Sequence, residues 1–408
     1  MMMRDLFPWY QPIVETASGR IAGYEALARQ KNEVGDVVSA GAFFSDSKHS
    51  LENRIAADRS VRYQALSGLN ELPGDSFISL NLSPEWLQFI AQTTRLPTLD
   101  MLRELDADPS RVMIEITELG GDLGLIQKAV DRYREAGFRI AIDDFGADFS
   151  QLDRVALLTP DVVKLDMKLL RDGLDNPRNA AMIQLLGEMA SRLGAKVLCE
   201  GVETEEAYFL ALSCNAYYTQ GFLFSEAKAE AAPTECFQSQ MISLREDYRD
   251  RALDSSTRNH WLAGKVSAEL IALRELIKTS GTAYGDIDLE HYLPTPQVLR
   301  FYLCDRSGNQ ISPNYENRQG GWNVDSAQKG SNWSWRPYFI ELLAFDDIDR
   351  RLVFSKPYHD IYAGQLSQTA ALLIDDDRIL LADMIINPPD RDLIYSHHGM
   401  QAQSVAVY

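Results

Sequence analysis

The amino-acid sequence predicts an α/β chain made of a (β/α)8 barrel of the TIM type, a helical linker and a small α+β domain. Three observations predict this arrangement. Short apolar runs alternate with longer helical patterns as far as residue 230, most of these runs end in a polar residue, and the composition changes after Pro233. The 408 residues allow two or three domains, because a domain usually has about 100–200 residues.

Eight apolar runs are the expected barrel strands. Amphipathic stretches such as Leu123–Ala136 and Ala180–Leu193 lie between them and have apolar side chains at helical spacing. Alternation of this kind is typical of βα units and predicts a parallel sheet or barrel. The runs are Gln11–Val14, Gly23–Ala28, Phe77–Leu82, Val112–Thr117, Arg139–Phe145, Val162–Met167, Lys196–Val202 and Tyr217–Phe224.

Polar side chains stand at the carboxyl ends of six of these runs. A (β/α)8 barrel collects its catalytic side chains at that end of its strands. A doubly wound open sheet is the alternative, but it would place a ligand at one switch point and would not draw a residue from nearly every strand. The residues are Asn81, Glu115, Asp143 with Asp144, Lys164 with Asp166, Glu200 and Gln220.

The composition and the hydrophobic pattern change over the last 170 or so residues. Residues 236–280 are rich in Glu, Arg, Leu and Ala and predict one or two long helices. Further on, Leu299–Cys304 precedes a turn, and Ala370–Ile374 and Arg378–Ile386 flank three aspartates, as strands of hairpins do. We therefore expect a barrel over 1–235, a linker over 236–280 and a small domain with an antiparallel sheet over 281–408.

Charge and cysteine usage exclude several classes of protein. The net charge of −19 argues against non-specific nucleic-acid binding, which needs clustered Lys and Arg. The cysteines Cys199, Cys214, Cys236 and Cys304 form no CxxC pair, which favours a reduced, cytoplasmic setting. No apolar run reaches 18 residues and the N-terminus lacks a signal-peptide core, so we expect no membrane span and no secretion by that route.

The polar residues at the strand ends are hard oxygen ligands. These suit Mg²⁺ or Mn²⁺ better than zinc. Any one strand-end carboxylate is more often a helix cap or a solvated turn residue, but the ordered set favours a site. Asp143 and Asp144, together with Glu115 and Glu200, could hold two metals, and such a pair stabilises an in-line phosphoryl displacement. Phosphodiester hydrolysis is therefore the expected reaction class.

The same residues resemble the motifs of the EAL-domain family. Glu25-Ala26-Leu27-Ala28-Arg29 is similar to the ExLxR signature, and the other motifs follow in the family's order. A combination of this kind is much more specific than any one of its parts. The matching segments are Gln11–Val14 (QPIV), Asn81–Ser83 (NxS), Glu115–Glu118 (EITE), Asp143–Gly146 (DDFG), Lys164–Asp166 (KxD), Glu200–Glu203 (EGVE) and Gln220–Gly221 (QG).

The resemblance implies a phosphodiesterase that hydrolyses cyclic di-GMP to linear pGpG with Mg²⁺ or Mn²⁺. It implies a first metal held by Glu25, Asn81, Glu115 and Asp143, and a second held by Asp143, Asp144 and Glu200, partly through water. Glu200, Lys164 and Glu25 would be catalytic, with Lys164 polarising the attacking water and Glu200 acting as general base. Substrate contacts would come from Gln11, Leu27, Arg29, Asp166 and Gln220, with Arg29 pairing a phosphate, and Glu118 would anchor the loop after Asp144.

One loop departs from the family pattern. The family usually has Gly-Tyr-Ser-Ser where this chain has Asp148-Phe149-Ser150-Gln151. An alternative is therefore a weakly active or inactive EAL protein that acts as a cyclic di-GMP receptor. A third possibility is a barrel that serves as a scaffold for dimerisation.

The aromatic segment Asn332–Phe339 is the most distinctive feature of the C-terminal region. It is either ordinary core or part of a ligand pocket in which Arg336 binds a carboxylate. Residues from about 255 to 408 resemble a PAS/PDC-like sensory fold, in particular the C-terminal domain of the YkuI type of EAL protein. This resemblance implies a sensory or dimerisation domain, with an unidentified small ligand, that regulates the barrel. The helices over 236–280 predict a homodimer.

Overall fold

The structure is a computed structural model that describes residues 6–45, 49–82, 84–93, 95–117, 122–146, 152–279, 287, 289, 292, 295–318, 321–344, 352–361 and 363–386. Among these, residues 6–249 form one compact unit and residues 250–386 form a second. The division falls inside a helix. The domain limits at 235 and 280 stay predictions.

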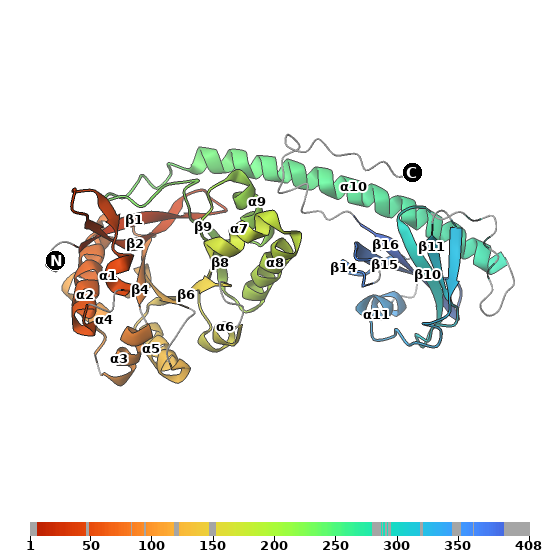
Figure 1. The fold of residues 1–408 in the computed structure, drawn as a ribbon, viewed down its shortest axis with the longest axis horizontal. Helices are drawn as coiled ribbons and strands as arrows, with labels where there is room; N and C mark the ends of the chain where they lie inside the picture. The colour runs from red at the N-terminus through yellow and green to blue at the C-terminus, as the bar shows by residue number, and fades with distance from the viewer. Residues whose placement is uncertain are drawn as a thin grey trace. The chain divides into compact units, whose positions relative to one another are not determined.

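Eight strands close a barrel in the first unit (Figure 1). Seven of them are parallel to their neighbours, and β1 (Leu6–Glu15) pairs with the first and the last of these to complete the ring. The predicted (β/α)8 barrel is thereby confirmed. The parallel strands are β2 (Ile21–Lys31), β4 (Phe77–Leu82), β5 (Val112–Thr117), β6 (Arg139–Phe145), β7 (Val162–Leu165), β8 (Lys196–Cys199) and β9 (Tyr218–Thr219), while β3 (Val37–Ser39) extends β2.

Strand β1 departs from the βα rhythm because it runs antiparallel to both of its neighbours. Only residues 16–20 connect it to β2. A parallel pair needs a crossover of about a dozen residues or more, so this short connection makes a hairpin. As a result, Gln11 lies directly opposite Glu25 in the hairpin register.

Helices cover the outside of the barrel. Asp122, Asn176 and Thr204 cap three of them with side-chain oxygens. The helices are α1 (Gly41–Ser45), α2 (Leu51–Ser67), α3 (Pro84–Gln92), α4 (Pro97–Glu104), α5 (Leu123–Glu135), α6 (Leu152–Leu158), α7 (Met167–Asp175), α8 (Pro177–Arg192) and α9 (Glu205–Ser213), with 3₁₀ turns at Leu69–Glu71 and Pro109–Arg111. Met167, expected at the end of a strand, begins α7 instead because Asp166 caps that helix.

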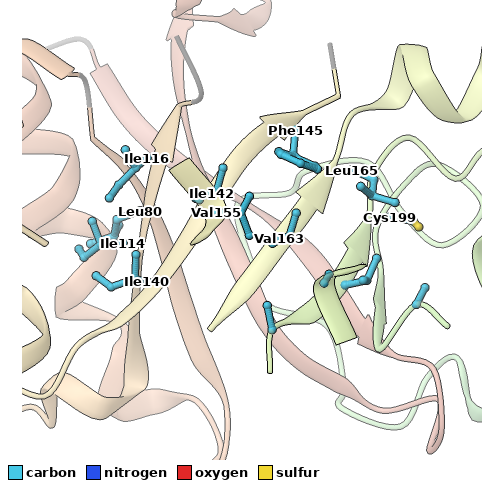
Figure 2. Packing of buried hydrophobic residues seen from close by; sticks show 14 of the residues in the cluster. Leu80, Ile114, Ile116, Ile140, Ile142, Phe145, Val155, Val163, Leu165 and Cys199 are labelled. Atoms are coloured by element: carbon cyan, nitrogen blue, oxygen red, sulfur yellow. The ribbon is translucent and has the colours of Figure 1, made fainter. Parts of the chain in front are cut away.

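The strands alternate between an outer and an inner row of side chains. Figure 2 shows outer residues such as Leu80, Ile114, Ile142 and Val163, which belong to the core between strands and helices. The inner row fills the foot of the barrel with an apolar cluster drawn from β1, β4, β5, β6, β7, β8 and β9. Its buried members are Ile13, Phe77, Met113, Ala141, Val162, Leu198 and Tyr218. Two residues further along most of these strands, the inner row becomes polar.

A single helix, α10 (Gln238–Thr279), occupies most of the predicted linker. Near its start, Met241 and Leu244 are buried in the core of the barrel unit. Near its end, Val266 and Leu270 are buried in the core of the second unit. The expectation of one or two long helices is thus met by one. Among the described residues, no helix has the length and apolar character needed to cross a membrane.

The second unit has an antiparallel sheet with a helix on each face. Residues of α10 cover one face, and α11 (Pro337–Leu343) covers the other. This arrangement confirms the predicted small α+β domain. The strand order is β12-β11-β10-β16-β15-β13, with β14 on β15, for β10 (Val298–Asp305), β11 (Asn314–Arg318), β12 (Gly321–Asp325), β13 (Leu352–Phe354), β14 (Tyr358–His359), β15 (Leu366–Leu373) and β16 (Arg378–Ile385).

The aromatic segment Asn332–Phe339 is divided between core and surface. Tyr338 and Phe339 are buried against the sheet. Trp335 is 63% exposed, and the guanidinium of Arg336 lies 4.3 Å from its ring centre. One part of the segment is therefore ordinary core, and a ligand-binding role for Arg336 stays a prediction.

Candidate active site

A single buried lysine lies among four carboxylates at the carboxyl end of the barrel strands. Lys164 on β7 is fully buried. Its Nζ lies 2.6 Å from Glu200 Oε1, 2.8 Å from Glu115 Oε2, 2.9 Å from Asp143 Oδ1 and 3.5 Å from Glu25 Oε2. The sequence places these four carboxylates on or directly after β2, β5, β6 and β8, and closure of the barrel brings them to one ammonium group.

A fifth carboxylate joins this group through an unusual backbone conformation. Asp144 has φ of +55°, in the left-handed region that few non-glycine residues adopt. The pairing of β6 with β7 shifts register at this point. One oxygen each of Asp143, Asp144 and Glu200 lies within 4.8 Å of the others, a spacing that could hold a metal ion. We call Glu25, Glu115, Asp143, Asp144 and Glu200 the carboxylate cluster.

Amide side chains fix the Glu25 carboxylate at both oxygens. Asn81 Nδ2 donates to Oε1 at 2.8 Å, and Gln220 Nε2 donates to Oε2 at 2.8 Å. Gln220 Nε2 also lies 3.2 Å from the Oε1 acceptor of Gln11. Three residues predicted from different parts of the sequence therefore orient one carboxylate.

Ser79 is a site residue that the sequence analysis missed. Its Oγ donates a hydrogen bond of 2.6 Å to Glu115 Oε1, and both side chains are fully buried. The available signal was the period-2 alternation of a strand, because Ser79 lies two residues before Asn81 and so shares its face.

The pKa values of the cluster reflect burial first and the surrounding charges second. Burial raises the pKa of Glu200 to about 8 even though Lys164 opposes this, and burial together with Glu25 raises that of Glu115 well above its usual range. Burial and the adjacent aspartate raise the pKa of Asp144 to about 6. Burial also disfavours the charged form of Glu25, but Lys164 and the two amides outweigh it and lower the pKa of Glu25.

The cluster fits divalent cations in charge and in ligand type. Five ionised carboxylates and one ammonium carry a net charge of −4, which two divalent cations would neutralise. Carboxylate and amide oxygens are the ligands that Mg²⁺ and Mn²⁺ prefer. Glu115 Oε2 and Asp143 Oδ1 are buried acceptors with no hydrogen-bond donor in good geometry, as expected of oxygens that face a cation.

A cavity of about 560 Å³ lies between β2 and β4 of the barrel and the helices α1, α2 and α3, and it reaches the cluster through Asn81, which bonds Glu25. Leu27, Arg29 and Asn81 line it, together with mostly apolar residues. Arg29 is half-buried and donates to the Ala28 carbonyl oxygen at 3.2 Å. Two predicted substrate residues therefore border a pocket of a size typical for ligands.

Asp166, another predicted substrate residue, is engaged in a helix cap. Asp166 Oδ1 accepts from the backbone N–H of Lys168 at 2.8 Å, so this carboxylate caps α7. Glu118, predicted to anchor a loop, and the altered segment Asp148–Gln151 lie outside the described residues.

The family model of the EAL domain matches residues 3–227. This chain belongs to the EAL-domain family. A second model, an EAL-domain associated signalling protein domain, matches residues 291–388. The EAL domain thus contains the whole barrel with its carboxylate cluster, and the associated domain contains the antiparallel sheet. The resemblance inferred from the sequence motifs is confirmed in both regions.

Individual relatives extend this result. Protein YkuI of Bacillus subtilis, an EAL-domain protein, is 28% identical over 400 residues, which cover 93% of this chain and 94% of YkuI. Its crystal structure, in complex with substrate c-di-GMP and calcium, superposes with a TM-score of 0.85 at 25% identity and covers 95% of this chain and 98% of YkuI. The probable cyclic di-GMP phosphodiesterase PdeB of Escherichia coli is 32% identical over 230 residues, 55% of this chain and 43% of PdeB.

Proposed function

We propose that this EAL-domain protein hydrolyses cyclic di-GMP to linear pGpG with the help of Mg²⁺ or Mn²⁺. The observation that carries the proposal is the carboxylate cluster around Lys164 at the carboxyl end of the barrel. The names of the relatives support it, because PdeB is described as a probable cyclic di-GMP phosphodiesterase and YkuI was crystallised with c-di-GMP.

Two cations would divide the cluster between them. Asn81 uses its Nδ2 for Glu25, so its Oδ1 is the atom that would face a cation. Bound divalent cations lower the pKa of water and stabilise the charge that develops on a phosphoryl group. We assign one cation to Glu25, Asn81, Glu115 and Asp143, and the other to Asp143, Asp144 and Glu200.

Side chains of the protein itself would take up the proton of the attacking water. Without a cation, burial raises the pKa of Glu200 to about 8; cations in the cluster would lower it and leave the ionised carboxylate that a general base needs to accept a proton from the attacking water. Lys164 lies 2.6 Å from its Oε1 and stabilises the carboxylate form before the transfer. Once cations take over some of the four carboxylates that now surround this ammonium, one of its three N–H donors would be left for the water oxygen.

The cavity beside Arg29 would receive part of the substrate. Its walls include Leu80, Leu82 and Trp86, which suit a flat nucleobase, and Arg29 at its edge suits a phosphate. Gln11 and Gln220 lie on the opposite side of Glu25 from the cavity residue Asn81 and would contact the substrate from there. Asp166, whose Oδ1 is engaged in capping, would contribute through Oδ2.

The test is a turnover assay on the full chain with Mg²⁺ or Mn²⁺, in which pGpG is quantified by chromatography. Glu25→Gln removes a proposed metal ligand and should lower turnover by more than about 100-fold. This is more than the loss usually seen when a residue that only hydrogen-bonds to a metal ligand is replaced. Glu188→Gln, on the surface of α8 where it pairs with Arg192, is the matched control and should leave turnover unchanged.

Two outcomes would count against the proposal. No turnover with either cation at any protein concentration would contradict it. Tight binding of cyclic di-GMP without product over hours would favour the receptor function, the alternative that the altered segment Asp148–Gln151 raises.

We further propose that the C-terminal domain regulates the barrel and that the protein is a homodimer. The support for regulation is α10, whose residues enter the core of both units, while the homodimer carries over from the expectation for the helices over 236–280. Comparing turnover by the full chain and by residues 1–249, which keep Met241 and Leu244 in the barrel core, tests the regulation. Analytical ultracentrifugation of the full chain tests the dimer, and a monomer at all concentrations would contradict it.

A further inference from the structure

We propose that Ser79 is a positioning residue that sets the Glu115 carboxylate for cation binding. The proposal rests on the cation-dependent function proposed for this site. Ser79 lies opposite Glu25 in the register of β2 and β4, but the carboxylate to which its hydroxyl donates is that of Glu115. Its hydroxyl acts through Glu115, to which it donates a hydrogen bond of 2.6 Å.

The geometry of two neighbouring strands produces this hydrogen bond. In the parallel register of β4 and β5, Asn81 lies opposite Glu115 and Ser79 lies opposite Met113. Ser79 therefore reaches Glu115 diagonally, from two residue pairs closer to the foot of the barrel. Hydrogen bonds from a hydroxyl to a carboxylate are typically short, about 2.5–2.7 Å, and stronger than neutral ones.

The two oxygens of Glu115 have different partners. Oε1 accepts from Ser79, and Oε2 lies 2.8 Å from Lys164 Nζ. The hydrogen bond from Ser79 holds Oε1, and the ammonium charge of Lys164 lies beside Oε2, so Oε2 faces the interior of the cluster. If the hydroxyl were lost, Oε1 would be buried without a donor and the carboxylate could rotate to share Oε2 between both roles.

Burial distinguishes this hydroxyl from an ordinary strand serine. Ser79 is fully buried in an inner row whose foot is apolar, and a hydroxyl there is costly unless it is hydrogen-bonded. In metal sites, a residue that does not touch the metal often orients a ligand through a hydrogen bond, and Ser79 has this relation to Glu115. Replacing such residues typically weakens metal affinity by about 10–100-fold.

The experiment measures Mn²⁺ binding to the nucleotide-free full chain by electron paramagnetic resonance, with thermal melting in EDTA as a check of folding. Ser79→Ala should weaken Mn²⁺ binding by about 10–100-fold. Ser79→Thr keeps the hydroxyl and should restore most of the affinity. Ser76→Ala is the matched control, since Ser76 is 2% exposed and directly precedes the same strand at the foot of the barrel; it should bind Mn²⁺ like the wild type.

Each result decides the matter. A folded Ser79→Ala protein that binds Mn²⁺ with wild-type affinity overturns the inference, as does a Ser79→Thr protein that binds as weakly as Ser79→Ala. If Ser79→Ala does not fold, Ser79→Cys, with its weaker donor, takes its place and should give an intermediate affinity; wild-type affinity there overturns the inference. A wild-type chain that binds Mn²⁺ but makes no pGpG overturns only the proposed function, and one that binds no cation overturns both.

Discussion

The Lys164→Met substitution tests the electrostatics of the site most directly. Methionine keeps roughly the length and the apolar stem of lysine but removes the ammonium group that four carboxylates share. In the absence of metal, the folded protein would then contain buried carboxylates with no cation. We expect a large loss of stability of the barrel unit.

The size of the loss follows from burial. Removing one partner of a buried charge pair costs about 3–5 kcal/mol. For a unit of this size each kcal/mol shifts the melting temperature by about 2–4 °C, so the barrel transition should fall by about 6–20 °C. Divalent cations replace the missing charge, and saturating Mg²⁺ should recover much of the difference.

The loss should also depend on pH. Without the ammonium, the pKa values of Glu200 and Glu115 rise further above the ordinary 4.5, so the folded state binds more protons than the unfolded state. A raised folded-state pKa contributes stability that is present at low pH and lost as pH rises through it. The deficit against the wild type should therefore be larger at about pH 8.5 than at about pH 6.

The assay is thermal melting of the full chain in EDTA, followed by circular dichroism at both pH values. Lys196→Met is the matched control, since Lys196 lies at the exposed start of β8 and stacks over the ring of Tyr217 at 3.8 Å. It should cost about 1 kcal/mol or less. A Lys164→Met melting temperature within about 2 °C of wild type at both pH values would refute the view that this ammonium neutralises the cluster.

Four further results are expected. The Mn²⁺ affinity of the wild type should rise between about pH 6 and pH 8.5, because cations must displace protons from Asp144 and Glu200, whose pKa values are about 6 and about 8. Calorimetry in buffers of different ionisation enthalpy should show that protons are released on binding. An affinity that does not change with pH would contradict this. Gly221→Ala should destabilise the barrel by about 1–3 kcal/mol or more, since a Cβ would lie 2.2 Å from a backbone carbonyl oxygen. In Gly264→Ala on α10, the added Cβ would have no atom within 4 Å beyond its own stretch of helix, so the variant should be more stable by up to about 1 kcal/mol. A lower free energy of unfolding in denaturant titration would contradict this. Arg300→Met should destabilise the second unit by about 3–5 kcal/mol because it leaves two buried aspartates without their cation, and an unchanged unfolding midpoint would contradict this.

Local pattern in the sequence was enough to predict most of the barrel. Apolar runs with period 2 identified β4 and β5 at their observed limits, because each strand of a barrel has a buried outer face and an inner face that turns polar at its carboxyl end. The position of polar residues at those ends predicted which side chains would meet. This inference needs only the rule that parallel strands end on the same side.

Connection length and strand register were beyond this kind of pattern. The antiparallel direction of β1 follows from its short connection to β2, but the sequence does not specify that these two strands pair. The expected strand at Tyr217–Phe224 shrinks to Tyr218–Thr219, because backbone beyond residue 219 turns to bond Val202 instead of continuing a ladder.

The strand-end pattern of the sequence therefore predicted that Glu115, Asp143, Asp144, Glu200 and Lys164 gather at one end of a barrel, and the family resemblance added Glu25. Only the tertiary structure decided how they share their contacts. Whether Lys164 reaches four carboxylates, and whether Ser79 reaches Glu115, depends on ångström-scale offsets between strands. Those offsets are set by barrel closure and by the register shift at Asp144, which involve residues far apart in the chain.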